Sequence, residues 1–198
     1  MTTSIYTHPA CLEHRPGLHH PESPQRLEAV LLALEGSEFA PAGRCEGARA
    51  TREQILLVHS EAYLDAVEAA APRDGYRALD GGDTIMSPGS WEAVLRCVGA
   101  TCAAVDAVVS GQARNAFCAT RPCGHHAEAE RAMGFCIFNQ AAIAALHART
   151  AHGLRSVAVV DFDVHHGNGT QNCFHDDADL FYGSSHQSPF YPGTGARH

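Results

Sequence analysis

Four ionisable side chains directly follow one apolar stretch in the last quarter of the chain. The stretch is Val157 to Val160, and Asp161, Asp163, His165 and His166 come after it. In extended chain, residues two apart point the same way, so Asp161, Asp163 and His165 are predicted to share one face. Two carboxylates and an imidazole suit a divalent metal ion, because charges in a low-dielectric interior must be paired or must bind a cation. The alternative is a solvated loop in which an Asp–His hydrogen bond fixes a turn.

A histidine pair occupies a second loop that is expected at the same edge. His125 and His126 follow Gly124, just after a predicted strand at 115–120. The run 157–160 is apolar on both faces, which is typical of a strand in the middle of a parallel sheet, and ligands gather beyond the carboxyl ends of such strands. Two imidazoles at that edge suit proton transfer, since imidazole titrates near pH ~6.5. A surface pair, or a pair satisfied by local hydrogen bonds, is the alternative.

The segments around these loops predict an α/β fold. A strand at 115–120, a polar loop, a helix from about 136 to 149 and a strand at 157–160 form a βαβ unit. This order favours a single domain with a central parallel sheet flanked by helices. Residues 72–90 are rich in Gly, Pro and Asp, and we expect a long loop there.

Helix signals are strongest in the first two thirds of the chain. Ser23, Thr51 and Ser60 are each predicted to cap the start of a helix, and residues 91–109 keep helical spacing of apolar side chains. Within that last helix Gly99 indicates close packing against a neighbouring segment. All of these features are interpreted as structural.

Composition narrows the class of protein. The 198 residues are 45% apolar, enough for the core of one sizeable domain. A net charge of −8 argues against an electrostatic grip on nucleic acid and favours a cationic small molecule or a basic peptide as partner. No stretch approaches the ~18 apolar residues of a membrane span. Eight scattered cysteines without a CxxC pair favour free thiols in a reducing compartment. The N-terminus has no basic segment followed by an apolar one, as a secretory signal would, so the predicted location is the cytoplasm.

Three motifs in order resemble the zinc-dependent histone deacetylase superfamily, which also includes acetylpolyamine amidohydrolases and acetoin-utilisation proteins. They are RPCGHHAEAERAMGFCIFNQAAIA, VVDFDVHHGNGTQ and SSHQSPFYPGTG. The N-terminal HPACLEHRPGLHHPESPQRLEAV and LLVHSEAYLDAV resemble the opening helices of the same family, so the resemblance covers nearly the whole chain. It implies an arginase/deacetylase-like fold and a zinc-dependent amidohydrolase that removes an acetyl or other acyl group from an acyl-lysine or acylpolyamine. From the charge and the apolar pattern, not from the resemblance, we expect no direct binding of nucleic acid and no membrane association.

The resemblance also implies the residues at the centre of the reaction. Asp163 and His165 would bind zinc, while His125 and His126 would face the attacking water and the scissile amide. Asp161 would orient His125.

Further positions are implied around this centre. Asn168 would stand behind His126, where some members carry Asp and class II-like members carry Asn, and the neutral amide should leave His126 less basic. Phe135 and Tyr191 would form the aromatic walls of a channel for the substrate. Gly134 would provide a backbone acceptor, and Asp83 a carboxylate at the rim. A potassium site would be formed by groups around Asp161, Asp163, His165 and Ser184.

In the family, the third zinc ligand and a transition-state tyrosine belong to sequence beyond the PGTG motif, and this sequence ends at His198. We therefore expect residues 1–198 to be the N-terminal part of a single class II-like deacetylase domain, with its C-terminal part missing. A different class stays open, namely a truncated, non-catalytic metal-binding or interaction protein that retains the deacetylase fold. The oligomeric state is left open.

Overall fold

A computed structural model describes residues 3–196 of the chain. The strands are β1 (Thr3–Thr7), β2 (Gly43–Glu46), β3 (Arg77–Ala78), β4 (Ile85–Met86), β5 (Asn115–Cys118), β6 (Val157–Asp161) and β7 (Leu180–Ser184). The α-helices are α1 (Pro24–Ala33), α2 (Arg52–Ile55), α3 (Glu61–Ala70), α4 (Ser90–Val109), α5 (Gln140–His152) and α6 (Asn168–Phe174). Two short 3-10 helices are η1 (Pro9–Leu12) and η2 (Ser37–Phe39).

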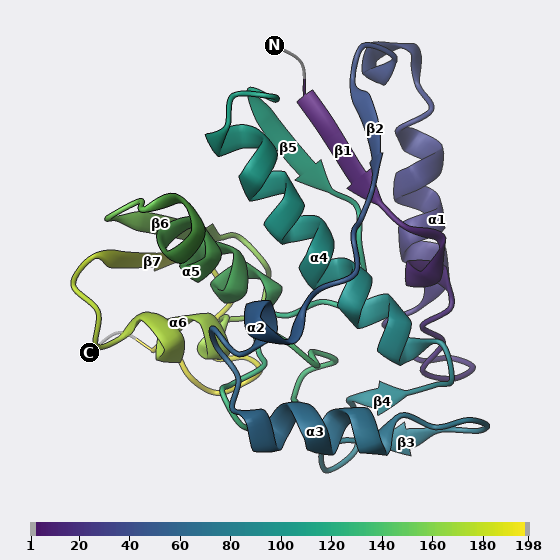
Figure 1. Cartoon of the computed structure of the whole chain (residues 1–198). Helices are drawn as coiled ribbons and strands as arrows, with labels where there is room; N and C mark the ends of the chain where they lie inside the picture. The colour runs from purple at the N-terminus through teal and green to yellow at the C-terminus, as the bar shows by residue number, and fades with distance from the viewer. Residues whose placement is uncertain (1–2, 197–198) are drawn as a thin grey trace.

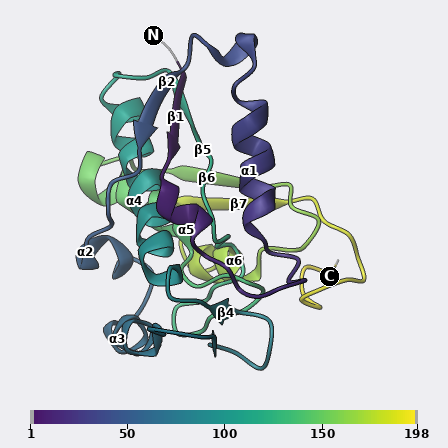
Figure 2. The same cartoon turned by 90° about the vertical axis from the view of Figure 1, so that its right-hand side faces the viewer.

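The parallel strands form two separate groups. One is a three-stranded sheet in the order β2-β1-β5, and the other is the pair β6-β7, both parallel throughout. In Figure 1 and Figure 2 the pair β6-β7 runs crosswise to β1, β2 and β5, with helices packed around both groups. The predicted α/β fold with parallel strands flanked by helices is confirmed.

The longest helix, α4, forms the centre of the fold. It packs against β1, β5 and α5, and its inward face carries the completely buried Val94 and Val98. Ile55 of α2, Leu64 of α3 and Ile143 of α5 belong to the same buried cluster. Burial of this apolar stripe explains why residues with helical spacing form a helix here.

The predicted helix starts are confirmed. Ser23 is the N-cap residue of α1, although its side chain makes no capping hydrogen bond. Thr51 forms a complete capping box at the start of α2, and the side chain of Ser60 accepts a hydrogen bond from the backbone of Tyr63 at the start of α3.

Two predicted boundaries differ from the structure. The helix expected from about residue 136 begins at Gln140, because the Asn139 side chain accepts a hydrogen bond from Ala142 N and so caps it. The preceding Ile137 and Phe138 are completely buried outside the helix. The loop expected at 72–90 contains the short antiparallel pair β3-β4.

The prediction that β6 lies in the middle of a sheet is wrong for the residues described. Within 3–196, β6 pairs only with β7, and Val160 is 71% exposed while Val157 and Val159 pack towards α5 and α6. The strand at 115–120, read as buried, likewise leaves Phe117 47% exposed. Apolar runs therefore marked both strands correctly but did not reveal which faces are covered. None of the helices described in 3–196 is long and apolar enough to cross a membrane.

Candidate active site

The loops after β5 and β6 meet, although these strands belong to different sheets. His125 Nδ1 lies 2.8 Å from Asp161 Oδ2, at the last residue of β6. A carboxylate only accepts hydrogen bonds, so His125 donates its Nδ1–H and keeps Nε2 free. That Nε2 faces Asp163 Oδ1 at 4.0 Å. Tyr182 of β7 donates to the same Asp161 oxygen at 3.0 Å, which fixes the carboxylate behind the imidazole.

Asp161 is well suited to stay ionised in this position. Burial by itself would raise the pKa of the Asp161 carboxyl, but hydrogen bonding and charge interaction with His125 outweigh it and hold the pKa below its ordinary value. The two groups thus form a close acid–imidazole pair.

His126 is held by a neutral partner. Its Nδ1 lies 2.9 Å from Asn168 Oδ1, and the Asn168 amide nitrogen donates to Glu128 Oε1 at 2.8 Å. Because the amide nitrogen faces Glu128, the amide oxygen accepts from His126, whose Nε2 stays free. Burial lowers the pKa of His126 to about 4, so this imidazole is neutral near neutral pH.

Asp163 and His165 fit one metal ion. His165 Nδ1 lies 3.3 Å from Asp163 Oδ1, and two ligands about 2.0–2.1 Å from a tetrahedral zinc ion are themselves about 3.3 Å apart. Asp163 is held by its backbone N–H, which donates to Asp161 Oδ1, and the His165 ring stacks on Phe190 with ring centroids 5.1 Å apart. Within residues 3–196 no third His, Cys or carboxylate ligand joins these two.

The expectation that the three side chains after β6 share one face is only partly met. The Asp161 side chain is 12% exposed, whereas those of Asp163 and His165 are 48% and 31% exposed. Asp161 faces His125, and Asp163 faces His165, so the predicted common face is divided between two partners.

One cavity of about 320 Å³ collects most of the predicted site residues. Its lining residues include Asp83, His125, His126, Gly134, Phe135, Asp163, His165 and Tyr191. Tyr191 stands edge-on to His126 with ring centroids 5.0 Å apart, and burial raises the pKa of its hydroxyl to about 12. The cavity therefore combines two imidazoles, a candidate metal pair and aromatic walls.

The loop that carries Asp83 is tied to the wall of this cavity. Asp80 Oδ1 accepts hydrogen bonds from the backbone of Gly82, Asp83 and Thr84. The Thr84 hydroxyl donates to Asp80 and accepts from the backbone N–H of Phe135 at 3.1 Å. This chain of hydrogen bonds places Asp83 at the cavity.

Gly134 is required by the shape of the site. Its φ is +57°, and a Cβ there would lie 2.5 Å from His126 Cδ2 and 3.0 Å from the Tyr191 ring. Its carbonyl, the predicted backbone acceptor, already accepts weak hydrogen bonds from the thiols of Cys136 at 3.3 Å and Cys123 at 3.7 Å.

Ser184 lies apart from this cavity lining. It pairs with Asp161 in the β6-β7 register, and its hydroxyl lies 2.8 Å from His186 Nδ1. The potassium site implied for it stays a prediction.

The sequence analysis missed other residues that contribute to the site, besides Asp80 and Thr84. Cys123 lines the cavity, His20 packs edge-on against Phe135, Tyr182 holds Asp161, and Glu128 holds Asn168. Two of these residues had a visible signal in the sequence. His20 belongs to the adjacent pair His19-His20, and Tyr182 lies in an apolar strand segment. The partnership of Glu128 depends on the folded loop and left no signal in the sequence.

Comparison with known proteins gives a consistent family. The protein-family model described as the histone deacetylase domain matches residues 20–198 of this chain. Histone deacetylase 14, chloroplastic, of Arabidopsis thaliana is 39% identical, over 96% of this chain and 49% of its own length. Polyamine deacetylase HDAC10 of Danio rerio is 35% identical, over 92% of this chain and 27% of its own length. The crystal structure of the HDA15 HD domain superposes with a TM-score of 0.92 at 34% identity, over 98% of this chain and 56% of that one.

The chain thus spans about half the length, or less, of the relatives it matches. The match extends through the loops that carry His125, His126, Asp163 and His165, all of which fall within the residues that the family model covers. On this evidence the chain belongs to the histone deacetylase domain family.

Proposed function

We propose that this chain carries the acid–base and metal-binding half of a zinc-dependent amidohydrolase site, which removes an acyl group from the amine of an acyl-lysine or acylpolyamine. One observation carries the proposal. His125 and His126 each have Nδ1 bound to an acceptor, and they share one cavity with Asp163 and His165. Free imidazole nitrogens beside a candidate metal pair are the arrangement that amide hydrolysis requires.

Zinc would be held by Asp163 and His165, and when bound it supplies Lewis acidity towards the amide carbonyl and acidifies the attacking water. Catalytic zinc normally has three protein ligands. The family resemblance implies a third ligand beyond PGTG.

The histidines would move the protons. His126 is neutral with Nε2 free, so it can accept a proton from water, and Asn168 keeps its ring in one orientation. His125, oriented by Asp161, completes the pair that returns a proton to the leaving amine. Asp161 and Asn168 therefore act as positioning residues.

The walls of the cavity would select the substrate. Phe135 and Tyr191 offer apolar contact to the carbon chain that carries the acylated nitrogen, and Asp83 at the cavity suits the N–H groups or cationic amines of the substrate. An acylated lysine peptide and an acylpolyamine both meet this description. The predicted cytoplasmic location and potassium site remain predictions.

The first test measures acetate release and bound zinc in the 198-residue chain. Acetyl-lysine peptide and N-acetylated polyamine serve as substrates, and His126→Ala is the variant. Turnover should fall by roughly 100- to 10,000-fold, the usual contribution of a general acid–base residue, while zinc content is unchanged. His175→Ala, at an exposed histidine on the C-terminal cap of α6, is the matched control and should behave like the unmodified chain.

A second variant tests the metal pair. Asp163→Ala should lower the bound zinc by one equivalent, and an undiminished zinc content would reject Asp163 as a ligand. Loss of zinc in His126→Ala would contradict the proton-transfer role. Absence of both turnover and zinc at Asp163 in the unmodified chain would favour the non-catalytic interaction protein.

A further inference from the structure

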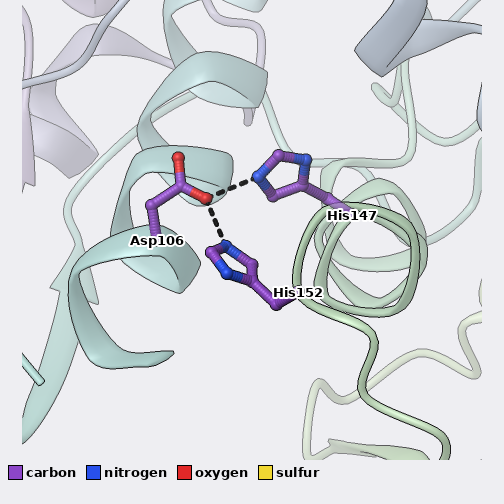
Figure 3. A group of neighbouring side chains, drawn as sticks. All are labelled: Asp106, His147 and His152. Atoms are coloured by element: carbon purple, nitrogen blue, oxygen red, sulfur yellow. Dashed lines mark hydrogen bonds and ion pairs between the residues drawn. The ribbon is translucent and has the colours of Figure 1, made fainter. Parts of the chain in front are cut away.

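A second group of metal-ligating side chains lies on α4 and α5, outside the candidate active site. Asp106 Oδ1 is 2.7 Å from His147 Nε2 and 2.7 Å from His152 Nε2. Figure 3 shows the carboxylate of Asp106 reaching from one helix towards both rings, which project from the other. The three ligand atoms all lie within 4.8 Å of one another. Neither α4 nor α5 contributes a lining residue to the cavity described above.

The convergence depends on how two helices end and pack. His147 and His152 are five residues apart, so on a regular helix of 3.6 residues per turn they point about 140° apart. They meet because His152 is the last residue of α5, before Gly153 in the left-handed conformation, and because Asp106 reaches between them from the last turns of α4. The rings stand almost perpendicular, at 87°, with centroids 5.8 Å apart. The ligands thus approach one point from different directions.

The donor set has the chemistry of a zinc-class site. Two imidazole nitrogens and one carboxylate oxygen are typical ligands of zinc and its neighbours among the transition metals, and they disfavour magnesium and calcium, which prefer oxygen. No fourth His, Cys or acidic ligand joins the group within 3–196. Water or a small ligand would complete the coordination, as in zinc sites with an open position.

We propose that Asp106, His147 and His152 form a binding site for one divalent transition metal ion of the zinc class, which links α4 to α5. The site is separate from Asp163 and His165 and independent of the proposed hydrolase function.

The accessibility of the group suits exchange with a dissolved ion. The side chains of His147 and His152 are 12% and 22% exposed, and that of Asp106 is 51% exposed. Ligands of one tetrahedral zinc ion lie about 3.3 Å apart, so each imidazole must retreat from the carboxylate by roughly 0.6 Å. The exposed Asp106 side chain has room for this adjustment, while the packing of α4 against α5 holds the backbones in place.

The simplest alternative is an interhelical clamp in which both rings donate Nε2–H to one carboxylate oxygen. In the clamp the Nε2 atoms carry protons, whereas a metal ion requires their lone pairs. The two readings therefore differ in zinc affinity and in which nitrogen carries the hydrogen.

The test uses the 198-residue chain with Asp163→Ala, so that the candidate active site cannot supply the binding. Equilibrium dialysis against buffered zinc should give one bound ion. Adding His147→Ala or Asp106→Asn to this background should weaken zinc binding by roughly 10- to 100-fold or more, since even indirect partners of ligands contribute that much. His175→Ala in the same background is the matched control and should leave the affinity unchanged.

A second readout separates a lost ligand from a damaged fold. Zinc should raise the melting temperature of the Asp163→Ala chain, because an ion that binds only the folded state stabilises it. Zinc should not raise the melting temperature of the double variants Asp163→Ala/His147→Ala and Asp163→Ala/His152→Ala. This holds even if, without zinc, these variants melt at the same temperature as the Asp163→Ala chain. Equal zinc affinity in these variants, or no binding by the Asp163→Ala chain, would overturn the proposal.

Discussion

Asn168 is held from both ends of its side-chain amide, and its oxygen orients the His126 ring. Its oxygen faces His126 Nδ1, while its nitrogen donates to Glu128. A neutral acceptor orients the ring without adding negative charge beside it. Burial lowers the pKa of His126 to about 4. A carboxylate at Nδ1 would raise this pKa again, but the neutral Asn168 amide carries no such charge.

Exchange of this amide for a carboxylate is predicted to have two opposite effects. Asn168→Asp should raise the pKa of His126, because negative charge at Nδ1 favours the imidazolium ion. It should also cost roughly 1–3 kcal/mol of unfolding free energy, since the new carboxylate faces Glu128 without a donor between them. NMR titration of the His126 ring in metal-free protein and urea denaturation measure the two effects.

The double variant Asn168→Asp/Glu128→Gln separates these contributions. Glutamine at 128 can donate to the new carboxylate, so stability should recover while the pKa of His126 stays raised. An unaltered His126 pKa in both variants would show that the orientation assigned to the Asn168 amide is wrong.

At the scale of elements, α4 and the segment that crosses it fit together without a side chain at Gly99. A Cβ at Gly99 would lie 1.9 Å from the Ala48 carbonyl oxygen, and Ala50 N donates to Leu95 O at 3.0 Å. The contact is between backbones, which cannot turn aside as a flexible side chain can. Close packing at Gly99, indicated by its small size in an apolar helix, is confirmed.

Gly99→Ala is therefore predicted to destabilise the protein. Alanine is the better helix former by about 1 kcal/mol, but overpacking costs typically 1–3 kcal/mol and more where the backbone must shift. We expect a net loss of roughly 1–3 kcal/mol in urea denaturation. Gly43→Ala is the control, because its added Cβ would meet Ser4 Oγ at an ordinary 3.7 Å. A more stable Gly99→Ala protein would contradict the packing argument.

At the scale of the whole molecule, buried His59 links segments far apart in the sequence. Its Nε2 accepts from Asn139 N at 2.9 Å, and its Nδ1 lies 3.3 Å from Ala129 O. The ring thus connects the start of α3 to the long loop after β5 and to the cap of α5. Burial lowers its pKa to about 4 from an ordinary 6.5.

This burial predicts loss of stability in mild acid. Between pH 6.5 and 4 the unfolded chain binds a proton at His59 that the folded chain does not, so unfolding free energy rises with pH there and falls as pH is lowered. The full loss from His59 is on the order of 3 kcal/mol. Urea denaturation between pH 7.5 and 4 measures it.

The comparison protein for this measurement is His59→Gln. Glutamine can keep both hydrogen bonds but does not titrate, so its unfolding free energy should depend less steeply on pH. Part of the slope should remain, because His126 has a similarly lowered pKa. Identical slopes in the two proteins would refute the assignment to His59.

The sequence by itself determined the local elements and the kinds of side chain that the candidate site contains. Caps at Thr51 and Ser60, the apolar spacing of α4 and the motif residues around Asp163 depend only on neighbours along the chain. The convergence of His125 with the residues after β6 was also predicted, because the carboxyl ends of parallel strands are common meeting points. The roles of these residues in catalysis stay predictions.

Only the tertiary structure decided which faces are covered and which distant groups meet. β6 pairs with β7 alone within 3–196, so Val160 is exposed despite its apolar context. The binding of Asn168 by Glu128, 40 residues away, and the meeting of Asp106 with His147 and His152 follow from helix packing and loop closure. The periodicity of a segment shows which of its side chains share a face, but it carries no information about which other segment that face will meet.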